Sequence, residues 1–307
     1  MTPSNALLGP VFKRESRFVW GLAYRMTGSA ADADDIVQET FSRALEHRPD
    51  TVRDLRPWLT SVAVNLGRDA LRRRRRRGYV GPWLPSPVDD DLVGPWAPDA
   101  SALLEKRERA AYAFLLALEV LTPQQRAVLV LRDVCGLSVA EAGRALQMSE
   151  ARVKVTHHRA RAQVKKSGRE PGQGDAQQTE RVRASLMRFV TALMTENDSE
   201  LLACLTEGAL VISDGGGEFL AALRPVRGAA RVVRFFTGLR RKLGKDGRFE
   251  VREVNGEPSV VAEISTEVAR AAPRWVLRLE VAPDGRIATL HLIAASAKLT
   301  HVRRLDR

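Results

Sequence analysis

Two groups of cationic side chains dominate the chemistry that this sequence offers. Residues 57–78 hold seven arginines against one aspartate, and residues 100–169 hold thirteen Lys or Arg against six Asp or Glu. These two segments account for more than the whole net charge of +12. Lys and Arg that neutralise phosphates release condensed counterions, so the pattern favours a nucleic-acid partner. A solvated helix face is the alternative explanation of the charge.

Residues suited to other chemistry are scattered. Acid–base catalysis would need a carboxylate or histidine inside an apolar pocket, and the candidates Asp214, Glu263 and His291 are not placed together by any motif. Cys135 and Cys204 lie far apart, with no CxxC pair and no clustered histidines, which argues against a disulfide or a zinc site. We therefore expect no catalytic residue, no metal and no cofactor.

The first cationic group ends a predicted helix. Pro57 suits a first helical position, and apolar residues then recur along one side of the helix: Trp58, Leu59, Val62, Ala63, Leu66 and Ala70. The pattern ends at Leu71, so the arginines of residues 72–77 would extend beyond the core with no acidic neighbour in sequence. We predict nucleic-acid contacts for Arg72, Arg73 and Arg76.

The second cationic group contains three helix starts. Thr122 with Gln125 and Ser138 with Glu141 form capping boxes, and Ser149 caps a helix over residues 150–166. Two short capped helices joined by the tight Gln147–Met148 turn predict a helix-turn-helix, whose second helix enters the major groove of DNA.

A helical projection separates the faces of residues 150–166. Val153, Thr156, Ala160 and Val164 share one sector and predict the core face. The opposite side carries the candidate DNA contacts. We expect bases to be approached by Arg152, Val155, His158 and Arg159, and phosphates by Lys154, Arg161, Lys165 and Lys166.

An acidic helix precedes both cationic groups. Ser29 and Asp32 resemble a capping box, and the apolar spacing of residues 36–45 predicts one buried face. The carboxylates of the first two turns suit the helix dipole, which is the simple explanation. The alternative is an acidic docking surface for a basic partner.

The chain after residue 169 changes character. Residues 169–178 are polar and predict a linker. Helices are expected over residues 179–195 and 229–243, followed by four strand-like runs with hairpin turns at Asn255-Gly256 and Asp284-Gly285.

The motifs ADADDIVQETFSRAL, RPWLTSVAVNLGRDALRRR and LTPQQRAVLVLRDVCGLSVAEAGRALQMSEARVKVTHHRARAQ, in this order, resemble the extracytoplasmic-function group of bacterial sigma factors. The resemblance implies that Asp34, Asp35, Gln38 and Glu39 bind core RNA polymerase. It also implies that residues 47–77 open and read the downstream promoter element, and that the helix-turn-helix reads the upstream element.

The segment YVGPWLPSPV resembles the linker of sigma factors fused to a SnoaL-like domain, which usually reads WLPEP; Ser86 replaces the glutamate. Asp214-Gly215-Gly216-Gly217 is similar to a motif of the same group, with Glu218 where a lysine is common. A stiff spacer and a simple loop are the alternatives. Prolines keep the segment extended, and we expect Trp83, Leu84, Pro85 and Pro87 to dock on the C-terminal domain.

The expected architecture is multidomain. Two all-α sigma domains, a helical bundle at 7–78 and a helix-turn-helix at 105–168, precede an α+β SnoaL/NTF2-like cone at 179–300, with linkers at 79–104 and 169–178. The resemblance implies a sigma factor that acts with core RNA polymerase and promoter DNA and is modulated by its own cone in place of an anti-sigma protein.

Two other functions stay open from the sequence: a free-standing helix-turn-helix regulator, and a DNA-tethered isomerase or cyclase. The sequence leaves open a small-molecule ligand in the cone, as well as the promoter motif and the direction of regulation. It has no run of eighteen apolar residues, and its first residues, MTPSNALLGPVFKRES, lack the pattern of a signal peptide, so we expect no membrane association and action in the cytoplasm.

Overall fold

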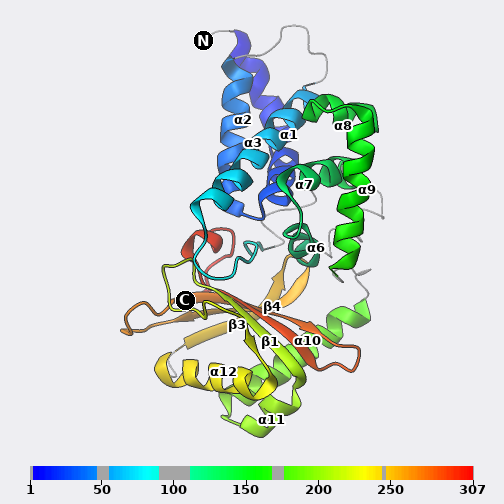
Figure 1. Cartoon of the computed structure of the whole chain (residues 1–307). Helices are drawn as coiled ribbons and strands as arrows, with labels where there is room; N and C mark the ends of the chain where they lie inside the picture. The colour runs from blue at the N-terminus through cyan, green and yellow to red at the C-terminus, as the bar shows by residue number, and fades with distance from the viewer. Residues whose placement is uncertain (1–2, 47–54, 90–110, 168–175, 244–246, 307) are drawn as a thin grey trace. The chain divides into compact units, whose positions relative to one another are not determined.

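The computed structural model describes residues 3–46, 55–89, 111–167, 176–243 and 247–306 of the chain (Figure 1). These residues fall into two compact units. Of the described residues, the first unit contains 3–46, 55–78 and 112–167, and the second contains 79–89, 176–243 and 247–306. The segment Tyr79–Asp89, called the linker ribbon below, therefore belongs in space to the C-terminal unit.

Three helices open the first unit: α1 (Pro3–Thr27), α2 (Ala30–Glu46) and α3 (Arg56–Arg77). They pack pairwise on one another (Figure 1). The sequence predicted α2 and α3 but gave no prediction for α1. On α3 the predicted stripe is partly wrong, because Trp58, Val62 and Leu66 are only half-buried. The fully packed residues are Leu59, Thr60, Ala63, Val64, Gly67, Ala70 and Leu71.

The shift of this stripe has a steric cause. A Cβ added at Gly67 would lie 2.8 Å from the Cβ of Met26 on α1. The absence of a side chain thus lets α1 and α3 approach closely along the Gly67 side of the helix. A hydrophobicity pattern scores glycine weakly and misses this contact.

The rest of the first unit is helical as well. It comprises α6 (Ala111–Leu118), α7 (Pro123–Leu129), a π-helical continuation of α7 (Val130–Val134), α8 (Val139–Leu146) and α9 (Glu150–Lys166). Both predicted capping boxes form, and Ser149 caps α9. Gln147 adopts a left-handed conformation with φ of 55° between α8 and α9. The predicted helix-turn-helix is confirmed.

Among the described residues, the second unit combines three α-helices and a short 3₁₀ helix (Ser296–Lys298) with one sheet. The helices are α10 (Ala176–Met194), α11 (Asp198–Ala203) and α12 (Ala229–Leu243). The strands are β1 (Leu205–Asp214), β2 (Val226–Arg227), β3 (Gly247–Val254), β4 (Glu257–Ile264), β5 (Arg274–Val281) and β6 (Ile287–Ile293). The order across the sheet is β2-β1-β6-β5-β4-β3. This is the predicted α+β cone.

The sheet contains more than the four hairpin-connected strands that the sequence predicted. β1 pairs with β6 in parallel, with Asp214 opposite Ile293, so the sheet is mixed. The other pairs are antiparallel, and Asn255-Gly256 forms the predicted two-residue turn between β3 and β4, both residues having positive φ. The strand β1 was not predicted, because the exposed residues Glu207 and Gly208 interrupt its alternating apolar pattern.

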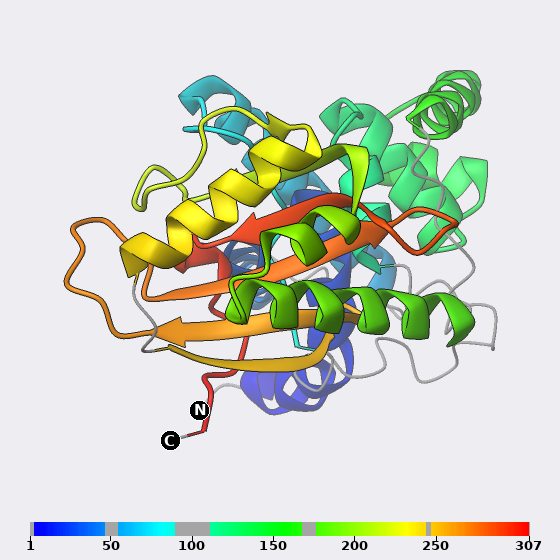
Figure 2. The same cartoon turned by 90° about the horizontal axis from the view of Figure 1, so that it is seen from below.

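The sheet has two chemically different faces. The helices α10, α11 and α12 lie across one of them, here called the helix face, and Leu277, Leu279, Leu290 and Leu292 pack beneath them (Figure 2). Because successive side chains of a strand alternate, Glu263, Arg278 and His291 point to the other face. The linker ribbon and the C-terminal residues 296–306 bind on this side, called the linker face. No helix in the described ranges is long and apolar enough to cross a membrane.

Candidate functional site

A buried carboxylate at the end of β1 holds the linker ribbon. Asp214 Oδ1 accepts hydrogen bonds from the Tyr79 hydroxyl at 2.5 Å and from the Gly216 amide at 3.1 Å. Asp214 Oδ2 accepts a 2.8 Å hydrogen bond from the Leu84 amide and is also bonded by the Lys298 ammonium. The ion pair with Lys298 is buried, since the two side chains are 0% and 5% exposed. Charge-assisted hydrogen bonds of this kind are the strong ones in a protein interior.

Lys298 extends the same cluster into the ribbon. Its ammonium also donates to the Leu84 carbonyl and lies 3.3 Å from the centroid of the Trp83 ring. The Tyr79 ring stands edge-on to Trp83 at 4.9 Å. A cation over an aromatic face is attracted by the ring quadrupole, so Lys298 binds the ribbon through both a charge contact and a ring contact.

The glycines after Asp214 bring the backbone close to the ribbon. Gly216 and Gly217 have positive φ of 63° and 76°. A Cβ at Gly216 would lie 2.8 Å from the Cβ of Ala295, and one at Gly217 would lie 3.2 Å from the Cβ of Val80. A Cβ at Gly215 would meet the Phe219 carbonyl oxygen at 2.6 Å. Both the conformation and the close approach therefore require glycine.

The far end of the ribbon is bound at a second place. The Val88 amide donates to Asn255 Oδ1 at 3.0 Å, and the Asn255 amide donates to the Val88 carbonyl at 2.9 Å. Asp89 accepts a 2.7 Å hydrogen bond from the Arg303 amide and forms an ion pair with Arg252 at 3.2 Å. Its own amide donates to the His301 carbonyl at 2.9 Å. The ribbon is thus fixed by the β3–β4 turn and by the C-terminal residues.

The structure brings the predicted linker residues and the predicted loop into one cluster. Leu84, Pro85 and Pro87 are buried, and Trp83 is half-buried. Ser86, which departs from the family pattern, is fully buried, and Glu218 accepts two hydrogen bonds from Ser296, at 3.2 Å from its amide and 2.8 Å from its hydroxyl.

Sequence reasoning missed several members of this site. They are Tyr79, Asp89, Arg252, Asn255, Lys298 and Arg303. The one usable signal was Lys298, a lysine inside the otherwise apolar and small-residue run of residues 292–299. Asp89 lies 214 residues from Arg303, and no local pattern connects them.

A separate basic surface lies on α9. The predicted DNA contacts on this helix are exposed, among them Arg152, Lys154, Val155, His158, Arg159, Arg161 and Lys165. Lys166 is exposed too, and Val153, Ala160 and Val164 are buried as the projection predicted. Asp133 pairs with His157 at 2.7 Å and with Arg161 at 3.3 Å. One predicted phosphate contact, Arg161, is therefore already bound to a carboxylate while two-thirds exposed.

The arginine run of α3 is not uniform, which corrects the expectation that no acidic group neutralises it. Arg72, Arg73 and Arg76 are exposed, but Arg72 pairs with Asp69 at 3.0 Å. Arg74 is only 18% exposed in its side chain and pairs with Glu119 at 2.7 Å. Burial lowers the pKa of Arg74, and Glu119 opposes this effect. Arg74 is a structural link between the two helical parts of the first unit.

The acidic residues of α2 differ in accessibility. Asp35, Gln38 and Glu39 are exposed, and Glu39 pairs with Arg43 at 2.7 Å. Asp34 is half-buried and accepts a 2.7 Å hydrogen bond from Trp20 Nε1. The exposed carboxylates form a surface that suits a basic partner.

The three candidate acid–base residues have separate partners. Asp214 holds the linker ribbon, Glu263 pairs with Arg274 at 3.4 Å, and His291 lies 3.9 Å from Glu280. All three belong to the linker face rather than to the helix face. No group of three or more metal-ligating side chains occurs among the residues that the structure describes.

Comparison with known proteins defines the class. Residues 11–77 match the model of sigma-70 region 2, and residues 111–164 match that of sigma-70 region 4. The ECF RNA polymerase sigma factor SigJ of Mycobacterium tuberculosis is 36% identical over 252 residues, which are 80% of this chain and 78% of the relative. A probable ECF sigma factor, SigI of the same species, is 29% identical over 287 residues, 92% of this chain and 91% of the relative.

A solved structure agrees with these relatives over nearly the whole chain. The crystal structure of M. tuberculosis SigJ matches with a TM-score of 0.71 and 29% identity, covering 96% of this chain and 98% of that one. A helical bundle followed by a helix-turn-helix of this kind defines a sigma-70-type promoter-recognition subunit. The chain belongs to the extracytoplasmic-function (ECF) family of RNA polymerase sigma factors.

Proposed function

We propose that this sigma factor carries its own regulator, and that the C-terminal cone restrains transcription initiation by holding the linker ribbon. The observation that carries this proposal is the buried cluster of Asp214 and Lys298 around Tyr79, Trp83 and Leu84. The ribbon directly follows region 2 and precedes region 4. A ribbon held on the sheet is not free to follow another path, so release from the cone precedes its engagement elsewhere.

We propose that polymerase binding and promoter recognition are divided between the sigma domains as they are in the family. The exposed residues Asp35, Gln38 and Glu39, with Asp34 beside them, bind core RNA polymerase in the cytoplasm. Arg72, Arg73 and Arg76 contact promoter DNA near region 2. The exposed face of α9 reads the upstream element, with Arg152, Val155, His158 and Arg159 toward bases and Lys154, Arg161 and Lys165 toward phosphates.

No catalytic role is proposed for the cone. The carboxylates that could serve as a base are engaged: Asp214 binds the ribbon, and Glu263 pairs with Arg274 and accepts a 3.3 Å hydrogen bond from the Leu305 amide. A general base must reach the proton that it abstracts, and these groups are already bound to other parts of the chain.

In vitro run-off transcription with core RNA polymerase tests the restraint. Promoters are first selected from a pool of fragments with the full chain. The variant Asp214→Asn is then compared with Asp284→Asn, which changes an exposed aspartate bonded to Arg286 in the β5–β6 turn. We expect Asp214→Asn to raise transcript yield about 5-fold or more, the lower range of couplings between sites. Asp284→Asn should leave the yield unchanged.

Two results would contradict the proposal. Equal transcript yields from wild type and Asp214→Asn would show that the Asp214–Lys298 cluster does not regulate initiation. A lower yield from Asp214→Asn would mean that the form with the bound ribbon is the active one. Thermal unfolding of both variants shows whether a loss of yield reflects a loss of folding.

A further inference from the structure

The sheet of the cone ends in two edges of different length. At one edge, β2 has only two residues, and so short a strand leaves little backbone for another chain to pair with. At the other edge, β3 is eight residues long. Among the described residues β3 pairs only with β4, apart from one bridge between Asp89 and Val254. Within the described part of the chain, the outer edge of residues 247–253 thus has no strand beside it.

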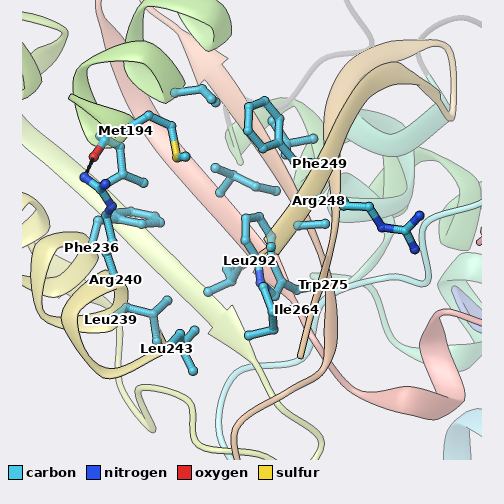
Figure 3. A pocket seen from close by; sticks show the side chains of 16 residues that line it. Met194, Phe236, Leu239, Arg240, Leu243, Arg248, Phe249, Ile264, Trp275 and Leu292 are labelled. Atoms are coloured by element: carbon cyan, nitrogen blue, oxygen red, sulfur yellow. Dashed lines mark hydrogen bonds between the residues drawn. The ribbon is translucent and has the colours of Figure 1, made fainter. Parts of the chain in front are cut away.

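The first half of this edge is exposed. Gly247, Arg248, Phe249 and Glu250 are all exposed to solvent. Because successive side chains of a strand alternate, Phe249 belongs to the helix face, and Arg248 and Glu250 belong to the linker face. In Figure 3, Phe249 is turned toward the apolar cavity between the helices and the sheet, whereas Arg248 points away from it.

The charges of this edge are self-complementary. Arg248 and Glu250 stand on either side of Phe249 and have opposite signs. If two copies of β3 run antiparallel with a two-fold axis at Phe249, Arg248 of each copy lies opposite Glu250 of the other. Opposite charges that face each other across two strands are stabilising, and like charges are destabilising.

Arg248 and Glu250 can each take a further partner. Arg248 donates to the Asp306 carbonyl at 2.5 Å and lies 3.7 Å from Glu263, yet its side chain is 53% exposed. Glu250 lies 3.5 Å from Arg252 and is 51% exposed. A guanidinium has several N–H donors and a carboxylate accepts at two oxygens, so both groups can form a second ion pair.

The charges also exclude the neighbouring registers. Side chains that lie opposite each other must share a face, so the axis of a symmetric antiparallel pair passes through a residue. An axis at Arg248 or at Glu250 sets that residue opposite its own copy, with like charges in contact. An axis at Val251 sets Arg248 opposite Val254, whose outer side is already bridged to Asp89. The axis at Phe249 uses only residues 247–251 and leaves this bridge intact.

The same register gives the contact an apolar centre. Phe249 is 43% exposed and would lie opposite its own copy on the helix face. Aromatic pairs are among the favourable pairs across two strands, and the main-chain groups of the edge supply the hydrogen bonds.

We propose that β3 is a self-association edge, at which two copies of this chain pair residues 247–251 antiparallel about a two-fold axis at Phe249 and join their sheets. Such a contact is isologous, because each copy contributes the same surface. It is small, so it belongs to the weak and transient class of interfaces. The proposal goes beyond the restraint by the cone and does not depend on it.

Analytical ultracentrifugation of the full chain over a concentration series tests the pairing by charge reversal. Arg248→Glu and Glu250→Arg each replace two attractive pairs by two repulsive ones, so each should weaken dimerisation roughly 10-fold or more. The double variant Arg248→Glu/Glu250→Arg restores opposite charges and should recover dimerisation. The control Arg286→Glu reverses an exposed charge in the β5–β6 turn and should leave dimerisation unchanged.

Two cysteine variants report the register directly. Residues opposite each other in antiparallel strands have Cα atoms about 4.5–5.5 Å apart, within the range that a disulfide spans. Phe249→Cys should therefore give a covalent dimer on mild oxidation. Val251→Cys lies opposite Gly247 of the second copy and should not. The wild type, with Cys135 and Cys204, gives the background of cross-linking.

Three results would overturn the proposal: a chain that stays monomeric at every concentration, a dimer that charge reversal leaves unchanged, or cross-linking through Val251→Cys but not through Phe249→Cys. A monomeric chain would leave the β3 edge to a strand of a different protein. Thermal unfolding of each variant distinguishes a loss of pairing from a loss of folding. No polymerase is present, so this outcome is separate from the transcription test.

Discussion

Asp214 and Lys298 form an ion pair that stabilises ribbon attachment only while both charged side chains are present. Four donors surround the Asp214 carboxylate, from Tyr79, Leu84, Gly216 and Lys298. Desolvation of two charges is expensive, and their attraction offsets this cost only while the geometry is intact. The pair therefore acts as a strong attachment that is lost as a unit.

Removal of one partner should be worse than removal of both. We expect Asp214→Asn and Lys298→Met each to weaken ribbon attachment by about 3–5 kcal/mol, because each leaves a buried charge unpaired. The double variant should cost clearly less than the sum of the single ones. Amide hydrogen exchange at Leu84, whose N–H donates to Asp214, measures the free energy of opening. Additive effects would contradict a coupled pair.

The glycine loop after β1 packs closely against the linker ribbon. Gly217 and Gly285 share a positive φ, 76° and 81°, but only Gly217 faces a neighbour. A Cβ at Gly217 would approach Val80 of the ribbon to 3.2 Å, whereas nothing lies within 4 Å of one at Gly285. Substitutions at these two glycines therefore distinguish the cost of backbone strain, which both share, from the effect of contact with the ribbon, which only Gly217 makes.

Gly217→Ala and Gly285→Ala should share a backbone cost of about 1–2 kcal/mol, since an L-residue is strained in the left-handed region. Only Gly217→Ala should loosen the ribbon. Limited chymotrypsin digestion, which cleaves after Tyr79 and Trp83, should accelerate for Gly217→Ala alone. Equal digestion of both variants would show that the ribbon tolerates the added methyl group.

Local signals explain which elements were predicted from the sequence. The caps at Ser138 and Ser149 act within three residues, so α8 and α9 and the exposed side of α9 followed directly. The strand β1 and the role of Lys298 did not follow, because they depend on partners far along the chain. Lys298 lies 84 residues from Asp214. The loop Asp214–Gly217 and the linker were assigned by resemblance rather than by physical pattern.

Over the whole chain the positive charge is concentrated in the sigma domains. The cone and its neighbouring segments add little, since residues 170–307 hold twenty-one basic against eighteen acidic residues. If α9 reads DNA as proposed, contacts between its lysines and phosphates should appear in the salt dependence of promoter binding, and lysines of the cone should not contribute.

Lys154→Gln and Lys165→Gln should each reduce the slope of log affinity against log salt by about 1, and weaken binding similarly for all promoter sequences. Lys242→Gln removes the same charge from an exposed position on α12 and should leave the slope unchanged. Promoter binding by the reconstituted polymerase complex over a salt series gives these slopes. An unchanged slope for both α9 variants would show that Lys154 and Lys165 do not contact DNA phosphates.

The interleaving of the two units along the chain has a consequence for synthesis on the ribosome. The ribbon at residues 79–89 emerges early, yet Leu84 meets Lys298 only across 214 residues. At bacterial or eukaryotic elongation rates this separation lasts roughly 10–40 s. Throughout that interval Trp83 and Leu84 have no sheet to cover them, whereas the helices of region 2 are already complete. The newly made chain therefore passes through a period in which region 2 has been synthesised and the ribbon is unbound, before Lys298 and Arg303 close the attachment.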